Sequence, residues 1–383
     1  MRQERWASSR AFNQSLKANL VARRCSILAS REDREIVWAL QGLSLKPGEL
    51  SRVGVSLGGG IIHTDLLAQL CLDPESDLFA YAARLREYFK RCASAVSGVV
   101  TTIGKTIEDA LAYCYESRST VLITGRARTG KTHAAQKFCE RYPGRFRYVQ
   151  CPSDGSDLSF YAAIGRALGI VIERDAKAKY LRPRCESVLQ NGDIGLCTDD
   201  AQFAWPAYDY RRARPSRICW LMTTLMNMRA PLALIGTEQF MQAQVDYTKK
   251  TGWCDSQLIG RVERFIELPD KVSLPDLQRV AKAYLPEPKF AEAVAHYANI
   301  SVKHMAAIEH LAKRANYLAK EDGRKQVEWS DVRSAITESP LPTDTAVAGL
   351  IARAGANQPA REGLEVRPRT VRDPLAETVK LDF

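Results

Sequence analysis

The sequence lacks paired cysteines, and this bears on two kinds of site. Its ten cysteines are scattered, and no two of them stand in a CxxC pair. A structural zinc site needs four ligands, usually at close paired spacing, so the pattern gives no zinc signal. A disulfide framework is also not expected in a chain of this length without a secretion signal. We therefore expect reduced thiols in a cytosolic protein.

Membrane and export signals are missing as well. No apolar run approaches the roughly 18 residues that a membrane helix needs. The first ten residues, MRQERWASSR, are charged and contain no apolar leader segment. We expect a cytoplasmic protein with no membrane partner.

Acidic residues are fewer than basic residues. The chain has 55 Lys and Arg against 44 Asp and Glu, which gives a formal net charge of +11. This excess suits a polyanionic partner such as DNA or RNA, although many basic proteins bind no nucleic acid. The chain has 383 residues, of which 45% are hydrophobic, so at about 100–200 residues per domain we expect two or three domains.

Short apolar segments alternate with helical periodicity in the middle of the chain. The apolar segments are Ser119–Thr124, Phe146–Gln150, Ile194–Thr198, Leu232–Ile235 and Phe265–Leu268. Apolar spacing typical of a helix occurs at Thr101–Glu116, and the stretches Lys131–Arg141 and Leu158–Leu168 between the segments are long enough for helices. Strands that alternate with helices predict an α/β domain with a parallel sheet covered on both faces.

Four regions are expected along the chain. They are a mostly helical region of unknown role at 1–100, an α/β core at 101–272, a small all-helical domain at 273–338 and a proline-bearing tail at 339–383. The tail's composition cannot bury much apolar surface, which predicts disorder. In the helical domain, Ser330 is the expected N-cap of a helix at Asp331–Glu338.

One segment fits a phosphate-binding loop in full. The sequence GRARTGKT matches the pattern GxxxxGK[ST] and consists of Gly125, Arg126, Ala127, Arg128, Thr129, Gly130, Lys131 and Thr132. In such a loop, backbone N–H groups surround phosphate oxygens and the next helix directs its positive end at them. Lys131 is expected to reach the β- and γ-phosphates, and the Thr132 hydroxyl to bind Mg²⁺. The loop follows a predicted strand and opens a predicted helix, so ATP and Mg²⁺ are the expected cofactors.

Two acidic residues, Asp199 and Asp200, end a later predicted strand, and Asp199 lies 68 residues after Lys131. Asp199 is expected near the metal ion, and Asp200 at the place of the acid that activates water. The alternative is a strand-end turn that needs Asp only for its backbone.

Two further features belong to the same predicted sheet. Thr237 ends a strand and is expected to sense the γ-phosphate, unless Gly236-Thr237 is an ordinary strand-to-loop turn. Arg261 and Arg264 are three residues apart, which predicts one helical face. An arginine from a neighbouring subunit can stabilise a phosphoryl group in transfer, whereas the alternative is a solvated basic helix end.

In this order, these features resemble AAA+ ATPases. The segments GRARTGKT, LCTDDAQ, PLALIGT and QLIGRVERF more narrowly resemble the transposition-regulator branch, which includes the Mu phage transposition B protein, TnsC, TniB and IstB. The resemblance covers roughly Thr101–Ile336 and implies a P-loop AAA+ core followed by a helical lid domain. It assigns the Walker A roles to Lys131 and Thr132, Walker B to Asp199, sensor 1 to Thr237 and the arginine finger to Arg261 or Arg264. Asp200 stands where the branch commonly has Glu, and Lys303 where it has the sensor 2 arginine.

The resemblance also implies partners. Proteins of this branch bind double-stranded DNA with little sequence preference, assemble as rings or filaments and recruit a transposase. Arg211, Arg212, Arg214 and Arg217 lie with two tyrosines in a segment that is suited to contact DNA phosphates. A second basic cluster lies between Lys177 and Arg184. A charged surface loop or a subunit contact is the alternative for the arginine segment.

The sequence thus predicts an ATP-hydrolysing, DNA-binding regulator of transposition that forms homo-oligomers. Three alternatives remain open. One is a signalling or defence ATPase that gathers protein partners. Another is a replication initiator or helicase loader. The third, a small-molecule kinase, is disfavoured by the helical lid and the arginine pair.

Overall fold

The computed structural model describes residues 17–45, 64–73, 78–96, 98–206, 215–301 and 304–339. These residues belong to two compact units. One takes its described residues from Met1–Gly98 and Ile103–Pro269, and the other from Val99–Thr102 and Asp270–Phe383. Among the described residues, no helix combines the length and the apolar character that a membrane crossing requires.

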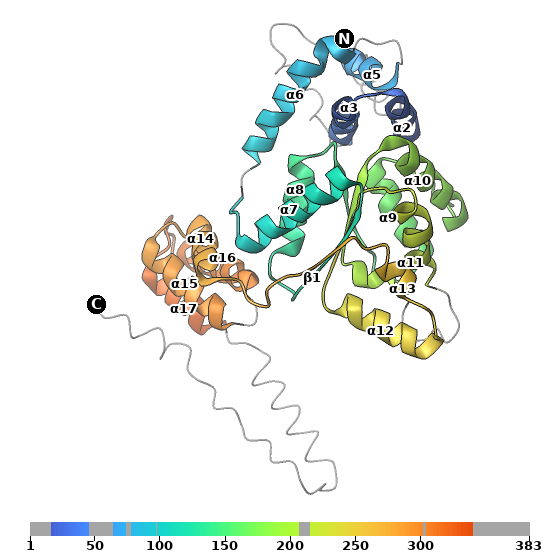
Figure 1. Cartoon of the computed structure of the whole chain (residues 1–383). Helices are drawn as coiled ribbons and strands as arrows, with labels where there is room; N and C mark the ends of the chain where they lie inside the picture. Colours follow the sequence, from blue (N-terminus) through green and yellow to red (C-terminus); the bar gives the residue numbers. More distant parts are fainter. Residues whose placement is uncertain are drawn as a thin grey trace, which may run out of the picture. The chain divides into compact units, whose positions relative to one another are not determined.

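A parallel sheet of five strands forms the centre of the first unit (Figure 1). The strands are β1 (Thr120–Thr124), β2 (Phe146–Gln150), β3 (Gly195–Asp199), β4 (Leu232–Gly236) and β5 (Arg264–Glu267). Their spatial order is β2-β3-β4-β1-β5, and every neighbouring pair is parallel. Each strand agrees with its predicted range to within one residue at either end. Every residue of β1, β3 and β4 is buried, which explains why these strands show no alternation of apolar and polar residues.

Helices cover both faces of the sheet, as predicted. On one face lie α7 (Thr102–Ser117) and α8 (Lys131–Arg141), where Tyr115 and Phe138 both pack near Phe146, with ring centroids 5.9 and 6.0 Å from it. The other face carries α9 (Asp157–Leu168), α10 (Ala178–Gly192) and α11 (Ser216–Trp220), which continues into the π-helical segment η2 (Leu221–Met226) (Figure 1). The remaining elements of the unit are the 3₁₀ turn η1 (Ala201–Ala204), α12 (Gln239–Thr251) and α13 (Ser256–Ile259).

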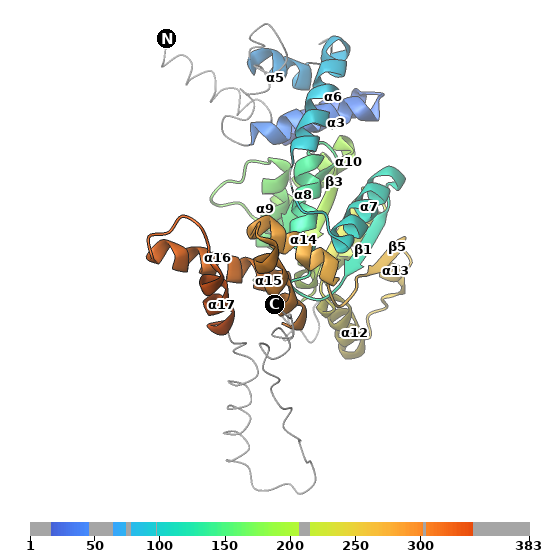
Figure 2. The same ribbon diagram turned by 90° about the vertical axis from the view of Figure 1, so that its left-hand side faces the viewer.

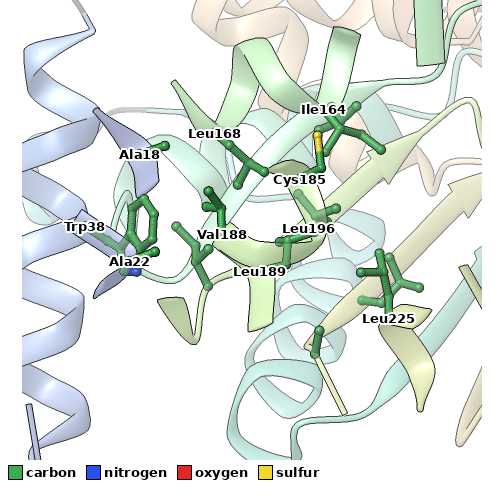
Figure 3. Close-up of a cluster of buried hydrophobic side chains, with 14 of the residues drawn as sticks. Ala18, Ala22, Trp38, Ile164, Leu168, Cys185, Val188, Leu189, Leu196 and Leu225 are labelled. Atoms are coloured by element: carbon green, nitrogen blue, oxygen red, sulfur yellow. The ribbon is translucent and has the colours of Figure 1, made fainter. Parts of the chain in front are cut away.

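The N-terminal helices share a core with the sheet domain. They are α2 (Ala18–Ile27), α3 (Arg31–Ser44), α5 (Thr64–Leu72) and α6 (Leu78–Ala95). Figure 3 shows Ala18, Ala22 and Trp38 beside Leu168, Val188 and Leu189. All six side chains belong to one continuous cluster of buried residues, which also includes residues of the sheet.

Buried hydrogen bonds fix α3 to the ends of α9 and α10. The indole Nε1 of Trp38 donates to the carbonyl oxygen of Gly192 at 2.6 Å, and Nε2 of Gln41 donates to that of Leu168 at 3.0 Å. From β2, the guanidinium of Arg147 donates to the carbonyl oxygen of Trp38 at 2.8 Å. Burial lowers the pKa of Arg147 to about 10, so its charge depends on these acceptors. The helix α3 is therefore an integral part of the first unit.

The second unit is helical, as predicted (Figure 2). Its helices are α14 (Leu274–Tyr284), α15 (Pro288–Ile300), α16 (Met305–Glu321) and α17 (Trp329–Thr337). The prediction that Ser330 caps the last helix is wrong. The cap is Glu328, whose backbone N–H donates to the Asp331 carboxylate at 2.8 Å in a capping box. This reciprocal pair starts the helix before Ser330. Residues 340–383, most of the predicted tail, lie outside the described residues.

The packing of Trp38 leads to a stability prediction. Trp38→Ala removes a fully buried ring together with the bond to Gly192, and we expect it to lower the free energy of unfolding by about 3–5 kcal/mol. Urea unfolding followed by far-ultraviolet circular dichroism measures this. Tyr180→Ala, at a ring that is 61% exposed, should change stability by no more than about 0.5 kcal/mol. Equal effects of the two substitutions would contradict the docking of α3.

Candidate functional site

The residues of the candidate site meet at one edge of the sheet. In parallel strands the carboxyl ends lie together, and ligands bind in the crevice beyond them. Thr124 pairs with Gly236, and Thr198 pairs with Leu234. The strands β1, β3 and β4 therefore deliver the P-loop, the two aspartates and Thr237 to the same edge.

The loop Gly125–Thr132 connects β1 to α8. Gly130 has a φ of 94° and forms the N-cap of α8, a left-handed conformation that a residue without Cβ adopts at little cost. Thr129 is fully buried and its hydroxyl donates to the carbonyl oxygen of Arg126 at 3.0 Å. Arg126, Ala127, Arg128 and Thr132 are exposed. The loop thus has a fixed base, an accessible rim and the Thr132 hydroxyl on the first turn of α8.

The ammonium group of Lys131 is folded onto its own loop. Its Nζ donates to the carbonyl oxygens of Gly125 at 2.8 Å and Arg126 at 2.5 Å. Burial lowers the pKa of Lys131, and the nearby carboxylates of Asp199, Asp200 and Glu238 oppose that shift. The lysine therefore faces the acidic strand end, and its hydrogen bonds go to neutral carbonyl groups that a phosphate can replace.

Asp199 is buried at the end of β3. One carboxylate oxygen accepts a hydrogen bond from the Tyr148 hydroxyl at 2.9 Å, and the other accepts from the backbone N–H of Asp200 at 3.0 Å. Burial, followed by the charge of Asp199, raises the pKa of Tyr148, so the hydroxyl keeps the proton that it donates. These two bonds hold the Asp199 carboxylate in one orientation.

Asp200 has a φ of 53°, in the left-handed region, where Asp is among the few non-glycine residues found with some frequency. Two glutamine amides hold its carboxylate. Gln150 Nε2 donates to Oδ2 and Gln202 Nε2 donates to Oδ1, both at 3.1 Å. Each oxygen keeps a further lone pair that can accept a proton.

Thr237 lies just beyond β4. Its backbone N–H donates to Oε1 of Gln202 at 3.3 Å. Its hydroxyl oxygen is buried and has no hydrogen-bond partner among the residues that the structure describes. A buried hydroxyl without a partner is costly, and a phosphate oxygen at this edge would satisfy it.

The two candidate arginine fingers lie elsewhere, and the prediction that they share a helical face is wrong. The helix α13 ends at Ile259, Arg261 follows in a turn, and Arg264 begins β5. Because Arg264 pairs with Val121 at the start of β1, it lies at the amino-terminal edge of the sheet, away from the P-loop. Arg261 is held by Asn227 at 3.0 Å. The guanidinium of Arg264 lies 5.6 Å from the ring centroid of Tyr113.

The expected DNA contacts need correction at one residue. Arg217 on α11 is only 5% exposed, its Nη1 donates to the carbonyl oxygen of Phe203 at 2.8 Å, and it pairs with Asp157 at 3.6 Å. A guanidinium engaged inside the unit does not reach a DNA phosphate. Arg211, Arg212 and Arg214 lie outside the described residues, as does Lys303.

Three side chains in the site carry no motif that marks them in the sequence. Tyr148 and Gln150 belong to β2, and Gln202 follows the acidic pair in LCTDDAQ. The pairing of Gln150 with Asp199 across the sheet is visible only once strand order is known. In the sequence, the only sign of a role for Gln150 is that this polar residue ends a predicted buried strand.

The donor set fits a nucleotide with Mg²⁺. No group of three or more His, Cys, Asp or Glu in the described part of the chain could hold a metal ion. In P-loop proteins Mg²⁺ is held by phosphate oxygens, water and one or two side chains. Thr132 and Asp199 offer side-chain oxygens of this kind at the sheet edge, and the Thr237 hydroxyl there has no partner among the described residues.

Comparison with known proteins agrees with this fold. Residues 115–243 match the model of a protein family described as AAA domain, and none of the curated proteins matches the chain. The family match and the order of the parallel sheet confirm the AAA+ fold class predicted from the sequence. This match does not distinguish the branches of that fold.

Several solved structures are similar. The ORC2 protein of Aeropyrum pernix in its ADP form has a TM-score of 0.48 and 17% identity, over 66% of this chain and 74% of that chain. Cdc6p from Pyrobaculum aerophilum has a TM-score of 0.45 and 16% identity, over 67% of this chain and 73% of that chain. The RuvB Holliday junction branch migration motor of Thermotoga maritima has a TM-score of 0.42 and 15% identity, over 67% of this chain and 78% of that chain.

The site predicts a difference between two substitutions. Thr237→Val removes the hydroxyl that is expected to bind the γ-phosphate, so ATP affinity should fall about tenfold while ADP affinity changes less than about twofold. Lys131→Met should weaken the binding of both ATP and ADP, because this lysine is expected to contact the β-phosphate as well. Titration with fluorescent ATP and ADP analogues measures both effects. Equal losses for ATP and ADP in Thr237→Val would rule out the γ-phosphate contact.

Proposed function

We propose that the protein is an ATP-hydrolysing switch that assembles with copies of itself and binds DNA. Nucleotide binding and hydrolysis are supported by one observation, the meeting of four polar groups at one edge of the sheet. The P-loop lysine, two held carboxylates and an unpartnered buried hydroxyl lie together there. Each matches a separate requirement of phosphoryl transfer, namely phosphate binding, metal binding, water activation and γ-phosphate contact.

In the proposed hydrolysis, Asp200 is the general base. The oxygen of a water molecule bonds to the γ-phosphorus, and the bond from that phosphorus to the β–γ bridging oxygen breaks. The electron pair of the broken bond stays with ADP, and one proton of the water passes to the Asp200 carboxylate. Lys131 stabilises charge on the phosphate oxygens. Mg²⁺, held by Thr132 and Asp199, would neutralise further charge there.

The position of Arg264 supports assembly. Its guanidinium forms no hydrogen bond with any described residue, whereas Arg261 is held by two. It also lies at the opposite edge of the sheet from the P-loop of its own subunit. Arg264 is therefore the better candidate for an arginine finger that reaches the nucleotide of a neighbouring copy.

A basic surface at the start of α10 supports DNA binding. Lys177, Lys179 and Arg184 are exposed and form no ion pair within the described residues. Tyr180 is 61% exposed beside Lys179, whose Nζ lies 4.9 Å from the ring centroid. Cations next to an exposed aromatic ring suit a nucleic-acid backbone and its sugars.

We further propose a role in DNA transposition, with a transposase as partner. The resemblance of GRARTGKT, LCTDDAQ, PLALIGT and QLIGRVERF to transposition regulators supports this role. Co-purification with a replicative helicase in place of a transposase would instead favour the replication-initiator alternative.

Mixing two inactive variants tests the shared site. Asp200→Asn keeps the finger and loses the base, whereas Arg264→Ala keeps the base and loses the finger. Each alone should lose at least about 100-fold in ATP turnover. A mixture should regain activity, because some interfaces combine an intact base with an intact finger. Phosphate release measures this. If the mixture is as inactive as the separate variants, Arg264 does not act between subunits.

Replacing two lysines tests the DNA surface. Lys177→Gln with Lys179→Gln should weaken ATP-dependent DNA binding and reduce the slope of log affinity against log salt by about 2. The matched control, Lys249→Gln with Lys282→Gln, removes the same charge from exposed lysines on α12 and α14 and should leave the slope unchanged. Fluorescence anisotropy with a duplex of random sequence measures both. Assembly with ATP but no DNA binding by the unaltered protein would favour the signalling alternative.

A further inference from the structure

Gln202 joins two parts of the site that sequence patterns treat as separate. Its Nε2 donates to Oδ1 of Asp200 at 3.1 Å, and its Oε1 accepts from the backbone N–H of Thr237 at 3.3 Å. The side chain is 9% exposed. A single buried amide thus bridges the acidic end of β3 and the end of β4.

The chemistry of the partners fixes how this amide is oriented. A carboxylate only accepts hydrogen bonds and a backbone N–H only donates, so Nε2 must face Asp200 and Oε1 must face Thr237. Because the amide is planar, one contact cannot move without affecting the other.

The surroundings leave Gln202 little freedom. It belongs to the short turn η1 directly after Asp200, and the N–H of Phe203 in that turn donates to the Asp200 carbonyl oxygen at 3.0 Å. A Cβ atom at Gly236 would lie 2.9 Å from Oε1 of Gln202. The glycine at the end of β4 thus provides the space in which the amide oxygen lies.

We propose that Gln202 is a positioning residue that couples the γ-phosphate contact at Thr237 to the orientation of the Asp200 carboxylate. The inference rests on the proposed ATPase function. A phosphate oxygen that binds the Thr237 hydroxyl constrains Thr237, and its N–H transmits that constraint through the amide to Oδ1 of Asp200. The base is thereby directed at water when a γ-phosphate is present.

Gln150 provides a matched control. It donates to the other oxygen of the same carboxylate at 3.1 Å, and the structure gives it no hydrogen bond to Thr237 among the described residues. A substitution there removes the other amide donor to the Asp200 carboxylate without breaking the bridge.

The test is a double-mutant cycle on ATP turnover. Gln202→Met and Gln150→Met are each measured alone and with Thr237→Val. Gln202→Met should lower kcat at least about tenfold with KM for ATP within about twofold. Added to Thr237→Val, it should cost clearly less than the product of the two single effects, because both substitutions interrupt one connection. Gln150→Met and Thr237→Val should instead multiply their effects.

A second variant guards against a folding artefact. Gln202→Glu keeps the acceptor for the Thr237 N–H and loses the donor to Asp200, so it should also lower kcat while melting within a few degrees of the unaltered protein. If Gln202→Met or Gln202→Glu keeps full kcat, or if Gln202→Met multiplies with Thr237→Val, the coupling is overturned and the proposed function stands. If the unaltered protein does not hydrolyse ATP, both are overturned.

Discussion

The structure depends on one constraint, the parallel alignment of all five strands. Because β1, β3 and β4 run in the same direction and in register, three loops that are far apart in the sequence end at one edge. The P-loop, the aspartate pair and Thr237 need no further device to meet. The same alignment places Arg264 at the opposite edge, so the sheet separates the residues proposed to bind phosphate from the residue proposed to reach a neighbouring subunit.

The polar groups at this edge of the sheet differ in how many hydrogen bonds they form. The Asp199 and Asp200 carboxylates are held by Tyr148, by a backbone N–H and by two glutamine amides. Among the described residues, the Lys131 ammonium donates only to carbonyl oxygens and the Thr237 hydroxyl has no partner. The two carboxylates are thus held in fixed orientations. The groups proposed to bind phosphate have either hydrogen bonds that a phosphate could replace or no partner among the described residues.

The strands, the helices on both faces and the P-loop could be predicted, because buried parallel strands and glycine-rich loops have strong local patterns. Features that depend on long-range pairing could not be predicted. The spacing of Arg261 and Arg264 indicated a helix, but pairing with β1 makes Arg264 a strand residue. Arg217 looked like a surface cation, yet Phe203 and Asp157 bind it inside the unit. Gln202 belongs to the segment LCTDDAQ, but its contacts with Asp200 and Thr237 depend on β3 and β4 being neighbours in the sheet.

Because α3 docks on α9 and α10, the N-terminal helices and the sheet belong to one folding unit. A chain shortened to begin at residue 101 would leave the carbonyl groups of Gly192 and Leu168 without their donors. It would also expose the apolar surface around Val188 and Leu189 to water and to aggregation. We therefore expect the helices before the sheet and the sheet itself to fold and unfold together.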